Sequence, residues 1–155
     1  MAKTDTATDV LKFLEDEHDE AKAVFKKLEK AEGATAAGLW TLLKDVLSGH
    51  EEREETLFYP SLKKEPAAKD LILEAYQEHH VMDLLIEEIS HLEPSDEVWA
   101  PKIKVLQENT EHHIEEEEGE LFPKVRKIWD AARREQVGRQ MQEAKANRQQ
   151  RQQVA

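Results

Sequence analysis

Four segments of the chain carry apolar residues at steps of three and four, and a histidine interrupts each of these apolar stripes. Such steps place side chains on one face of an α-helix, so we expect four helices that bury this face. The stripes comprise Leu11, Leu14, His18, Ala21, Phe25 and Leu28; Leu39, Leu43, Val46, His50, Glu54 and Leu57; Ile72, Ala75, His79, Met82, Ile86 and Ile89; and Ile103, Leu106, Thr110, His113, Glu117, Leu121, Val125 and Ile128.

Short segments that interrupt helices separate the four stripes. They are "EGAT" at 32–35, "KKEP" at 63–66 and "EPSD" at 93–96, and glycine and proline are typical of such boundaries. Strong helix formers dominate the composition, and 155 residues suffice for one domain with a buried core. The sequence therefore predicts an all-α fold, with an up-down-up-down four-helix bundle over residues 1–130.

Residues 131–155 differ from the rest of the chain in charge. They hold six basic and two acidic side chains, a net charge of +4, whereas the whole chain carries −12 and the remainder therefore −16. This basic, Gln/Arg-rich segment is predicted to be a polar C-terminal tail or a short fifth helix that frays into "NRQQRQQVA".

The acidic body of the chain argues against nucleic acid as a partner, because phosphate groups repel it, and it is compatible with attracting metal cations. The start, "MAKTDTATDVLKF", lacks the apolar run of a signal peptide, and no stretch approaches the roughly 20 apolar residues of a membrane span. We expect a cytoplasmic protein without membrane contact, as a monomer or weak homodimer. The absence of cysteine restricts any metal site to nitrogen and oxygen ligands.

The two halves of the chain resemble each other. The histidine of the second stripe follows that of the first by 32 residues, and the histidine of the fourth follows that of the third by 34. "HEEREETLFYP" at 50–60 matches "HIEEEEGELFP" at 113–123, and in both a glutamate follows the histidine by four and a proline follows that glutamate by six. A helix pair used twice, with approximate two-fold symmetry, brings all four histidines to one level of the core. Each proline either ends its helix or kinks it and so tunes how the glutamate enters the core.

The His-x-x-x-Glu pairs aim an imidazole and a carboxylate at the same point, because positions i and i+4 lie one helical turn apart. Burying ionised carboxylates costs on the order of several kcal/mol, and no stripe holds a lysine or arginine at this level. Four imidazoles and two carboxylates suit two ions, and this set favours iron, with manganese and zinc as alternatives. The predicted metal ligands are His18, His50, Glu54, His79, His113 and Glu117, with the glutamates bridging.

Several neighbouring residues have alternative interpretations. His80 takes the place of His79 as a ligand if the third helix is rotated. Asp83, four residues after His79, is a surface residue, an acceptor for a ligand's hydrogen bond or a terminal ligand. His91 and His112 are expected at the surface. The large aromatic residues are expected to pack in the core or at its margin, although a tyrosine near an oxidising metal can act as a redox partner; they are Tyr59, Tyr76, Trp40, Trp99 and Trp129.

These motifs resemble the hemerythrin-like, or HHE cation-binding, family over about residues 8–130. The resemblance is carried by "EDEH" with His18, "HEEREETLFYP" with His50 and Glu54, "EHH" with His79, and "HHIEEEEGELFP" with His113 and Glu117. It implies a four-helix bundle around a non-haem di-iron centre with an oxo or hydroxo bridge. Ferritin-like bundles are less similar, because they use Glu-x-x-His and more oxygen ligands.

The chain departs from the oxygen-carrying hemerythrins, which have His-x-x-x-His on the third helix and His-x-x-x-x-Asp on the fourth. Here Asp83 follows His79 and Glu117 follows His113, so the fifth histidine is missing. The set is more similar to bacterial hemerythrin-like proteins that are linked to peroxide, nitric oxide or iron homeostasis. Fewer protein ligands leave more positions open for water or substrate, which favours reaction over simple carriage.

Two functions follow from this resemblance. The first is catalase-like breakdown of hydrogen peroxide in oxidative stress or iron homeostasis, with no catalytic residue separate from the metal centre. The second is reversible binding, sensing or storage of O2 or NO, or supply of iron, without turnover. A third interpretation is a purely structural bundle without metal, in which His113→Ala is tolerated or stabilising.

Overall fold

The computed structural model describes residues 8–154, and its regular structure is helical. Two π-helical segments, η1 (Glu54–Phe58) and η2 (Glu117–Leu121), join α2 to α3 and α5 to α6. No β-strand occurs between residues 8 and 154, which confirms the predicted all-α class. In chain order the α-helices are α1 (Val10–Leu28), α2 (Gly33–Arg53), α3 (Tyr59–Leu62), α4 (Lys69–Ser90), α5 (Trp99–Glu116), α6 (Phe122–Ile128) and α7 (Ala131–Val154).

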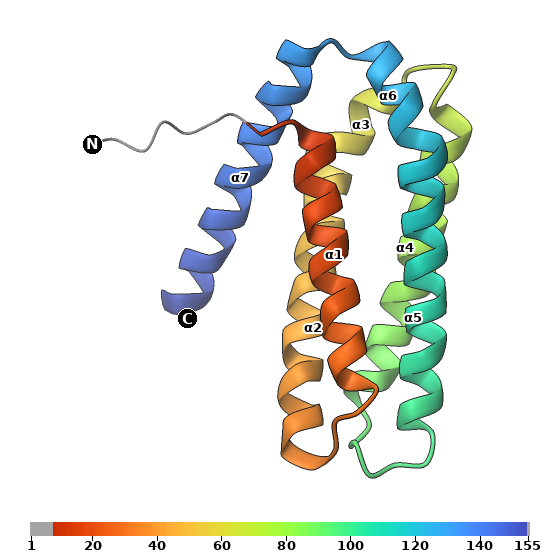
Figure 1. Cartoon of the computed structure of the whole chain (residues 1–155), viewed down its shortest axis with the longest axis vertical. Coiled ribbons are helices and arrows are strands. Elements are labelled where there is room, and N and C mark those ends of the chain that lie inside the picture. The colour runs from red at the N-terminus through yellow and green to blue at the C-terminus, as the bar shows by residue number, and fades with distance from the viewer. Residues whose placement is uncertain (1–7, 155) are drawn as a thin grey trace.

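The long helices α1, α2, α4 and α5 lie side by side, and each runs antiparallel to the one before it (Figure 1). Short connections produce this arrangement, because they leave a helix room only to turn back along its predecessor. The connections fall at the predicted breakers. The first one ends at Glu32, and α2 begins with Gly33, whose φ of 56° lies in the left-handed region that glycine adopts without strain.

The π-helical segments begin at the two glutamates of the repeated motif, Glu54 and Glu117. The N–H of Tyr59 donates to the carbonyl of Glu54, and the N–H of Phe122 donates to that of Glu117, in each case five residues back. A proline follows each donor and has no N–H, so the regular hydrogen-bond series is interrupted there. π-turns within α-helices are frequent at functional sites.

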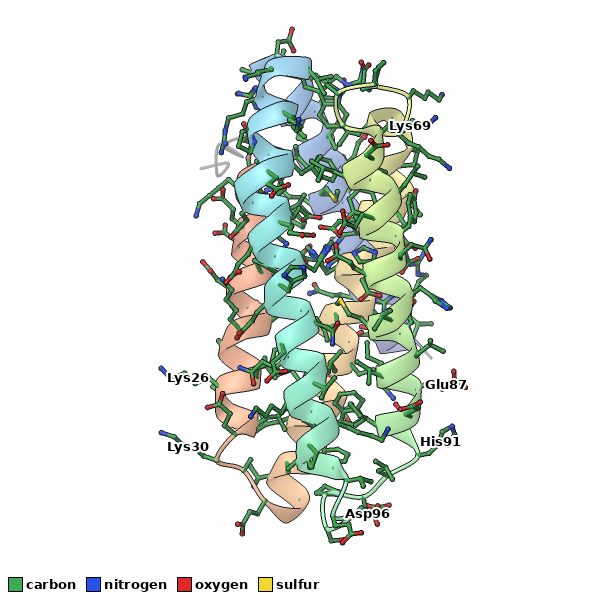
Figure 2. The ribbon with its side chains drawn as sticks, turned by 90° about the vertical axis from the view of Figure 1, so that its right-hand side faces the viewer. Lys26, Lys30, Lys69, Glu87, His91 and Asp96 are labelled. Carbon is green, nitrogen blue, oxygen red and sulfur yellow. The ribbon has the colours of Figure 1, made fainter. Side chains whose placement is uncertain are left out.

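The apolar core forms two clusters, one on either side of a polar layer. Along each of the four long helical segments, residues of one cluster come first, then buried histidine or glutamate, then residues of the other cluster. Figure 2 shows nitrogen atoms gathered between the helices about midway along the bundle. One cluster includes Leu14, Phe58, Leu62, Ile72 and Phe122, and the other includes Phe25, Leu43, Ile89, Trp99 and Leu106.

The C-terminal segment forms a 24-residue helix, α7, which is longer than the predicted tail or short fifth helix. It runs back along α1 and α2 and contacts both (Figure 1). Val137 and Met141 are buried in the contact. A Cβ atom at Gly138 would lie 1.8 Å from the carbonyl oxygen of Thr8, so the approach of α7 requires glycine at this position.

Charge complementarity also holds α7 in place. Lys145 pairs with Glu17 and Glu20 of α1 at 3.2 and 3.4 Å. Arg148 pairs with Asp45 and Glu52 at 3.3 and 2.6 Å. The basic segment therefore packs against the acidic faces of α1 and α2, which explains how a helix with few apolar residues remains attached.

Charged residues cover the outside of the bundle. Lys26 and Lys30, and Glu87 and His91, point away from the helices in Figure 2. His91 is exposed, as predicted. Within residues 8–154, no helix combines the length and the apolar content that a membrane crossing requires.

Candidate metal centre

The six predicted ligands lie together in the polar layer of the bundle. Each of the four long helices contributes one histidine, and each π-helical segment contributes its first residue, a glutamate. All six residues are buried, with at most 6% of their surface exposed. They are His18 of α1, His50 of α2, Glu54 of η1, His79 of α4, His113 of α5 and Glu117 of η2.

Glu54 presents a different carboxylate oxygen to each pair of histidines. Its Oε1 lies 2.9 Å from His50 Nε2 and 3.9 Å from His18 Nε2. Its Oε2 lies 3.0 Å from His79 Nε2 and 3.9 Å from His113 Nε2. The centre therefore has a first half-site, with His18 and His50, and a second half-site, with His79 and His113, and Glu54 faces both.

Glu117 spans the same two half-sites. Its Oε1 lies 3.2 Å from His18 Nε2, and its Oε2 lies 3.3 Å from His113 Nε2. All ligand atoms of the group His18, His50, Glu54 and Glu117 lie within 4.8 Å of one another, close enough to surround a single ion.

The first half-site contains buried polar atoms without hydrogen bonds. These atoms approach one another, but none of them has a hydrogen-bond partner. Leaving such an atom unpaired costs about 1–3 kcal/mol, and a cation at their common focus would offset this cost. The donor set thus fits a metal ion. The atoms are Nε2 of His18, Nε2 of His50, Oε1 of Glu54 and Oε1 of Glu117.

The other ring nitrogen of every histidine faces a carboxylate. A carboxylate at Nδ1 fixes the orientation of the ring, directs Nε2 to the centre and makes it a stronger ligand. The pattern follows the internal repeat, because each glutamate directly precedes or follows one of the six central residues. The pairs are His18 with Glu118 (3.2 Å), His50 with Glu17 (3.3 Å), His79 with Glu55 (3.1 Å) and His113 with Glu78 (3.0 Å).

Protons on the histidines balance the buried carboxylates in the metal-free protein. Burial opposes the charged form of His18, but Glu117 and Glu54 raise its pKa to about 10. The pKa of His79 is also raised to about 10, against burial, chiefly by its hydrogen bond to Glu54. Burial would raise the pKa of Glu54 itself, yet the surrounding imidazolium groups, led by His50, hold it well below its usual value. A bound metal ion must displace these protons.

Tyr59 belongs to the centre, although the sequence pointed to core packing for it. Its hydroxyl oxygen lies 2.8 Å from Glu54 Oε2 and 2.6 Å from Glu117 Oε2. It also lies 3.4 Å from His79 Nε2 and 3.5 Å from His113 Nε2. Burial, reinforced by the charges of the two glutamates, raises the pKa of Tyr59 well above its ordinary value. A neutral hydroxyl group thus lies beside the donor atoms of the second half-site.

The neighbouring residues with alternative interpretations lie at different depths in the structure. His79 lies in the centre, whereas His80 is exposed. Asp83 is exposed and lies outside the groups that can hold a metal. Burial raises the pKa of Glu51 to about 9; His79 opposes this shift, and the neighbouring Asp83 adds to it. His112 is exposed, as predicted.

An antiparallel helical bundle with a buried histidine and glutamate centre is the architecture of a helical cation-binding protein. The sequence matches the family described as hemerythrin HHE cation binding domain over residues 9–125. The chain belongs to this family, which confirms the resemblance seen in its motifs. The matched range ends before α7, and the division of the chain near residue 130 stays a prediction.

Two known proteins are similar to this chain, one in fold and one in sequence. A hemerythrin HHE cation binding domain-containing protein from Mycobacterium kansasii has the same fold, with a TM-score of 0.77 and 23% identity over 86% of this chain and 83% of that chain. A protein from Nostoc sp. (strain PCC 7120) that is named DNA nickase is 30% identical over 105 residues, which make up 68% of this chain and 30% of that protein. The chain thus spans less than a third of that relative.

Proposed function

We propose that the centre binds two iron ions, one at each half-site, and that Glu54 and Glu117 bridge them. One observation carries this proposal: each glutamate directs one oxygen to the first half-site and the other oxygen to the second. Each half-site also supplies two imidazole nitrogens. This mixture of nitrogen and oxygen donors suits iron.

The reaction that we propose for such a centre is the breakdown of hydrogen peroxide. Bound iron would supply redox chemistry and open coordination positions. One peroxide molecule is oxidised to O2, and a second accepts the two electrons and two protons and becomes two water molecules, so no outside reductant is needed. The two apolar clusters keep bulk water from the centre, and the Tyr59 hydroxyl group can hold or pass a proton beside the Oε2 atoms of both glutamates.

Reversible binding of O2 or NO, in sensing or storage, or the supply of iron, is the second candidate function. The specific observation in its favour is that the centre is enclosed, since all six ligand residues are at most 6% exposed. An enclosed centre protects a bound gas from exchange with solvent. Turnover of peroxide separates the two functions.

The resemblance to a DNA nickase does not extend the proposal to nucleic acid. The matched region covers only 30% of that protein. The chain carries a net charge of −12, and an acidic surface repels phosphate groups.

Iron analysis and oxygen evolution together test the proposal. The metal-free protein is loaded with ferrous iron under argon, freed of excess metal and assayed for iron content, and O2 release from hydrogen peroxide is then measured with an electrode. We expect about two ions per chain, since the six ligands suit two metals, and O2 release in proportion to iron content. Release no faster than from an equal amount of free ferric ion would reject the enzymatic function. Failure to retain iron would reject the centre itself.

A further inference from the structure

A second group of metal-ligating side chains lies on the surface, where α4 and α5 meet. It consists of Glu78, His112 and Glu116, here called the outer cluster, and one ligand atom of each residue lies within 4.8 Å of the others. His112 Nε2 is 3.3 Å from Glu116 Oε1 and 3.9 Å from Glu78 Oε2. The side chain of His112 is 63% exposed, and those of the glutamates are 18% and 27% exposed. A hydrated ion can therefore reach this cluster directly.

The outer cluster borders a narrow hollow that ends at the buried centre. Glu78 and Glu116 line this hollow together with His113 and Glu117 of the centre. Its free volume is about 10 Å³, close to the smallest space that holds one water molecule. Glu117 is 3% exposed, and its Oε1 is buried without a hydrogen-bond partner. Carboxylate side chains thus lead from solvent to Glu117, whose Oε2 faces His113 and whose unpartnered Oε1 faces His18 of the first half-site.

Glu78 connects the outer cluster with the centre. Its Oε1 lies 3.0 Å from Nδ1 of His113, and its Oε2 faces His112. Within residues 8–154, neither Glu78 nor Glu116 pairs with a lysine or an arginine. The negative charge of the outer cluster is therefore balanced only by histidine, which leaves it available to a cation.

In the other half of the repeat, arginine side chains fill the position equivalent to the outer cluster. Arg53 stands where Glu116 stands in the second half, and it donates two hydrogen bonds to Glu17, the counterpart of Glu78. Gly49 stands in the place of His112, and a Cβ atom there would lie 3.0 Å from Nε of Arg148 of α7. One side of the centre is thus sealed, and the corresponding outer cluster stays open.

We propose that the outer cluster captures a divalent cation such as ferrous iron and passes it through the hollow to the buried centre. The inference rests on the proposed metal centre and adds the route by which it is filled. Two carboxylates and one imidazole form a ligand set suited to ferrous iron and to similar divalent ions. Partly exposed ligands on one side and buried ligands on the other allow an ion to exchange water for protein donors step by step.

The rate of metal loading tests this route. Metal-free protein is mixed rapidly with cobalt(II), binding is followed by the visible absorption of the ion, and the final cobalt content is measured by elemental analysis. We expect Glu116→Gln to slow loading by about tenfold, because it weakens a focused negative potential that accelerates the arrival of cations by this order. We expect His112→Ala to slow loading as well, because it removes the imidazole ligand of the outer cluster. The final content should stay at that of the wild type. The matched control is Glu115→Gln, which removes the same charge from an adjacent exposed residue outside the outer cluster.

The outcomes separate this route from the centre that it serves. If the protein binds two ions per chain and both variants load at the wild-type rate, the proposed route is wrong, but the proposed metal centre is not contradicted. Equal slowing in Glu115→Gln and Glu116→Gln would also overturn it, because general charge would then account for the rate. A wild-type protein that binds no cobalt would overturn both proposals.

Discussion

Tyr59 and Phe122 occupy equivalent positions in the two halves of the chain, each five residues after a buried glutamate, but only Tyr59 brings a hydroxyl group into the centre. The Phe122 ring instead stacks beside His18, with the ring centroids 6.2 Å apart. The protein therefore supplies a hydrogen-bond donor to the second half-site and none at the equivalent point of the first. The two half-sites are alike in ligands and different in their surroundings.

Replacing Tyr59 by phenylalanine should destabilise the metal-free protein. Glu54 Oε2 and Glu117 Oε2 would lose a buried donor, and we expect the free energy of unfolding to fall by about 1–3 kcal/mol. Urea denaturation of the metal-free variant measures this change. The control is Tyr76→Phe. The Tyr76 ring packs against the Tyr59 ring, with the ring centroids 5.3 Å apart, but Tyr76 lies outside the centre. Equal losses in both variants would contradict the role given to the Tyr59 hydroxyl group.

Glu54→Gln should lower the metal content more than His50→Ala. Glu54 faces both half-sites, whereas His50 faces only the first. We therefore expect about one ion per chain in His50→Ala and less than one in Glu54→Gln, since both sites lose a charged ligand only in the latter. Elemental analysis after iron loading and desalting measures both values. Two ions retained in each variant would be incompatible with the proposed ligand set.

The metal-free protein should lose stability as the pH rises from about 6.5 to about 10. His18 and His79 have pKa values raised from 6.5 to about 10 on folding, so their contribution is complete below 6.5 and is lost as the pH rises through 10. On the acid side, the pKa of Glu17 is lowered from 4.5 to about 2: burial opposes this shift, but His50 and Arg53 outweigh it. The contribution of Glu17 is therefore lost as the pH falls through 2.

Thermal melting at pH 6, 8 and 9.5, with and without iron, checks this dependence. Metal binding displaces protons from the histidines, so the stabilisation by iron should grow as the pH rises. The metal-free and iron-loaded curves should diverge toward alkaline pH. Parallel curves would show that the histidines do not bind both protons and metal.

Gly138→Ala should loosen α7. The added Cβ atom would meet the carbonyl oxygen of Thr8 at 1.8 Å, and such overpacking costs about 1–3 kcal/mol. Gly38→Ala in α2 is the matched control, because a Cβ there meets nothing within 4 Å, and alanine favours a helix interior over glycine by roughly 0.5–1 kcal/mol. Limited proteolysis and urea denaturation should show that Gly138→Ala is destabilised and that Gly38→Ala is as stable as the wild type or more stable. The reverse order would contradict the packing described for α7.

The sequence favoured core or margin packing for Tyr59, because helical periodicity assumes an unbroken α-helix. Regular steps from Glu54 led to Leu57, which is only half-buried, whereas Phe58 and Tyr59 are fully buried. The π-turn at Glu54 shifts the inward face by about one residue, and this shift depends on backbone hydrogen bonds that a pattern of side chains does not reveal. The proline six residues after each glutamate was the available signal, but it does not separate a helix end from a π-turn.

The helical class and the inward direction of His18, His50, His79, His113 and both glutamates could be predicted from the order of residues alone. Local periodicity determines which side chains share a face, and few arrangements bury four such faces together. The tertiary structure alone decided the position of Tyr59, the Nδ1 partners of the histidines and the docking of α7. These features depend on contacts between residues far apart in the chain, such as Gly138 with Thr8 and Lys145 with Glu17. No local pattern specifies them, because each becomes favourable only after the helices have assembled.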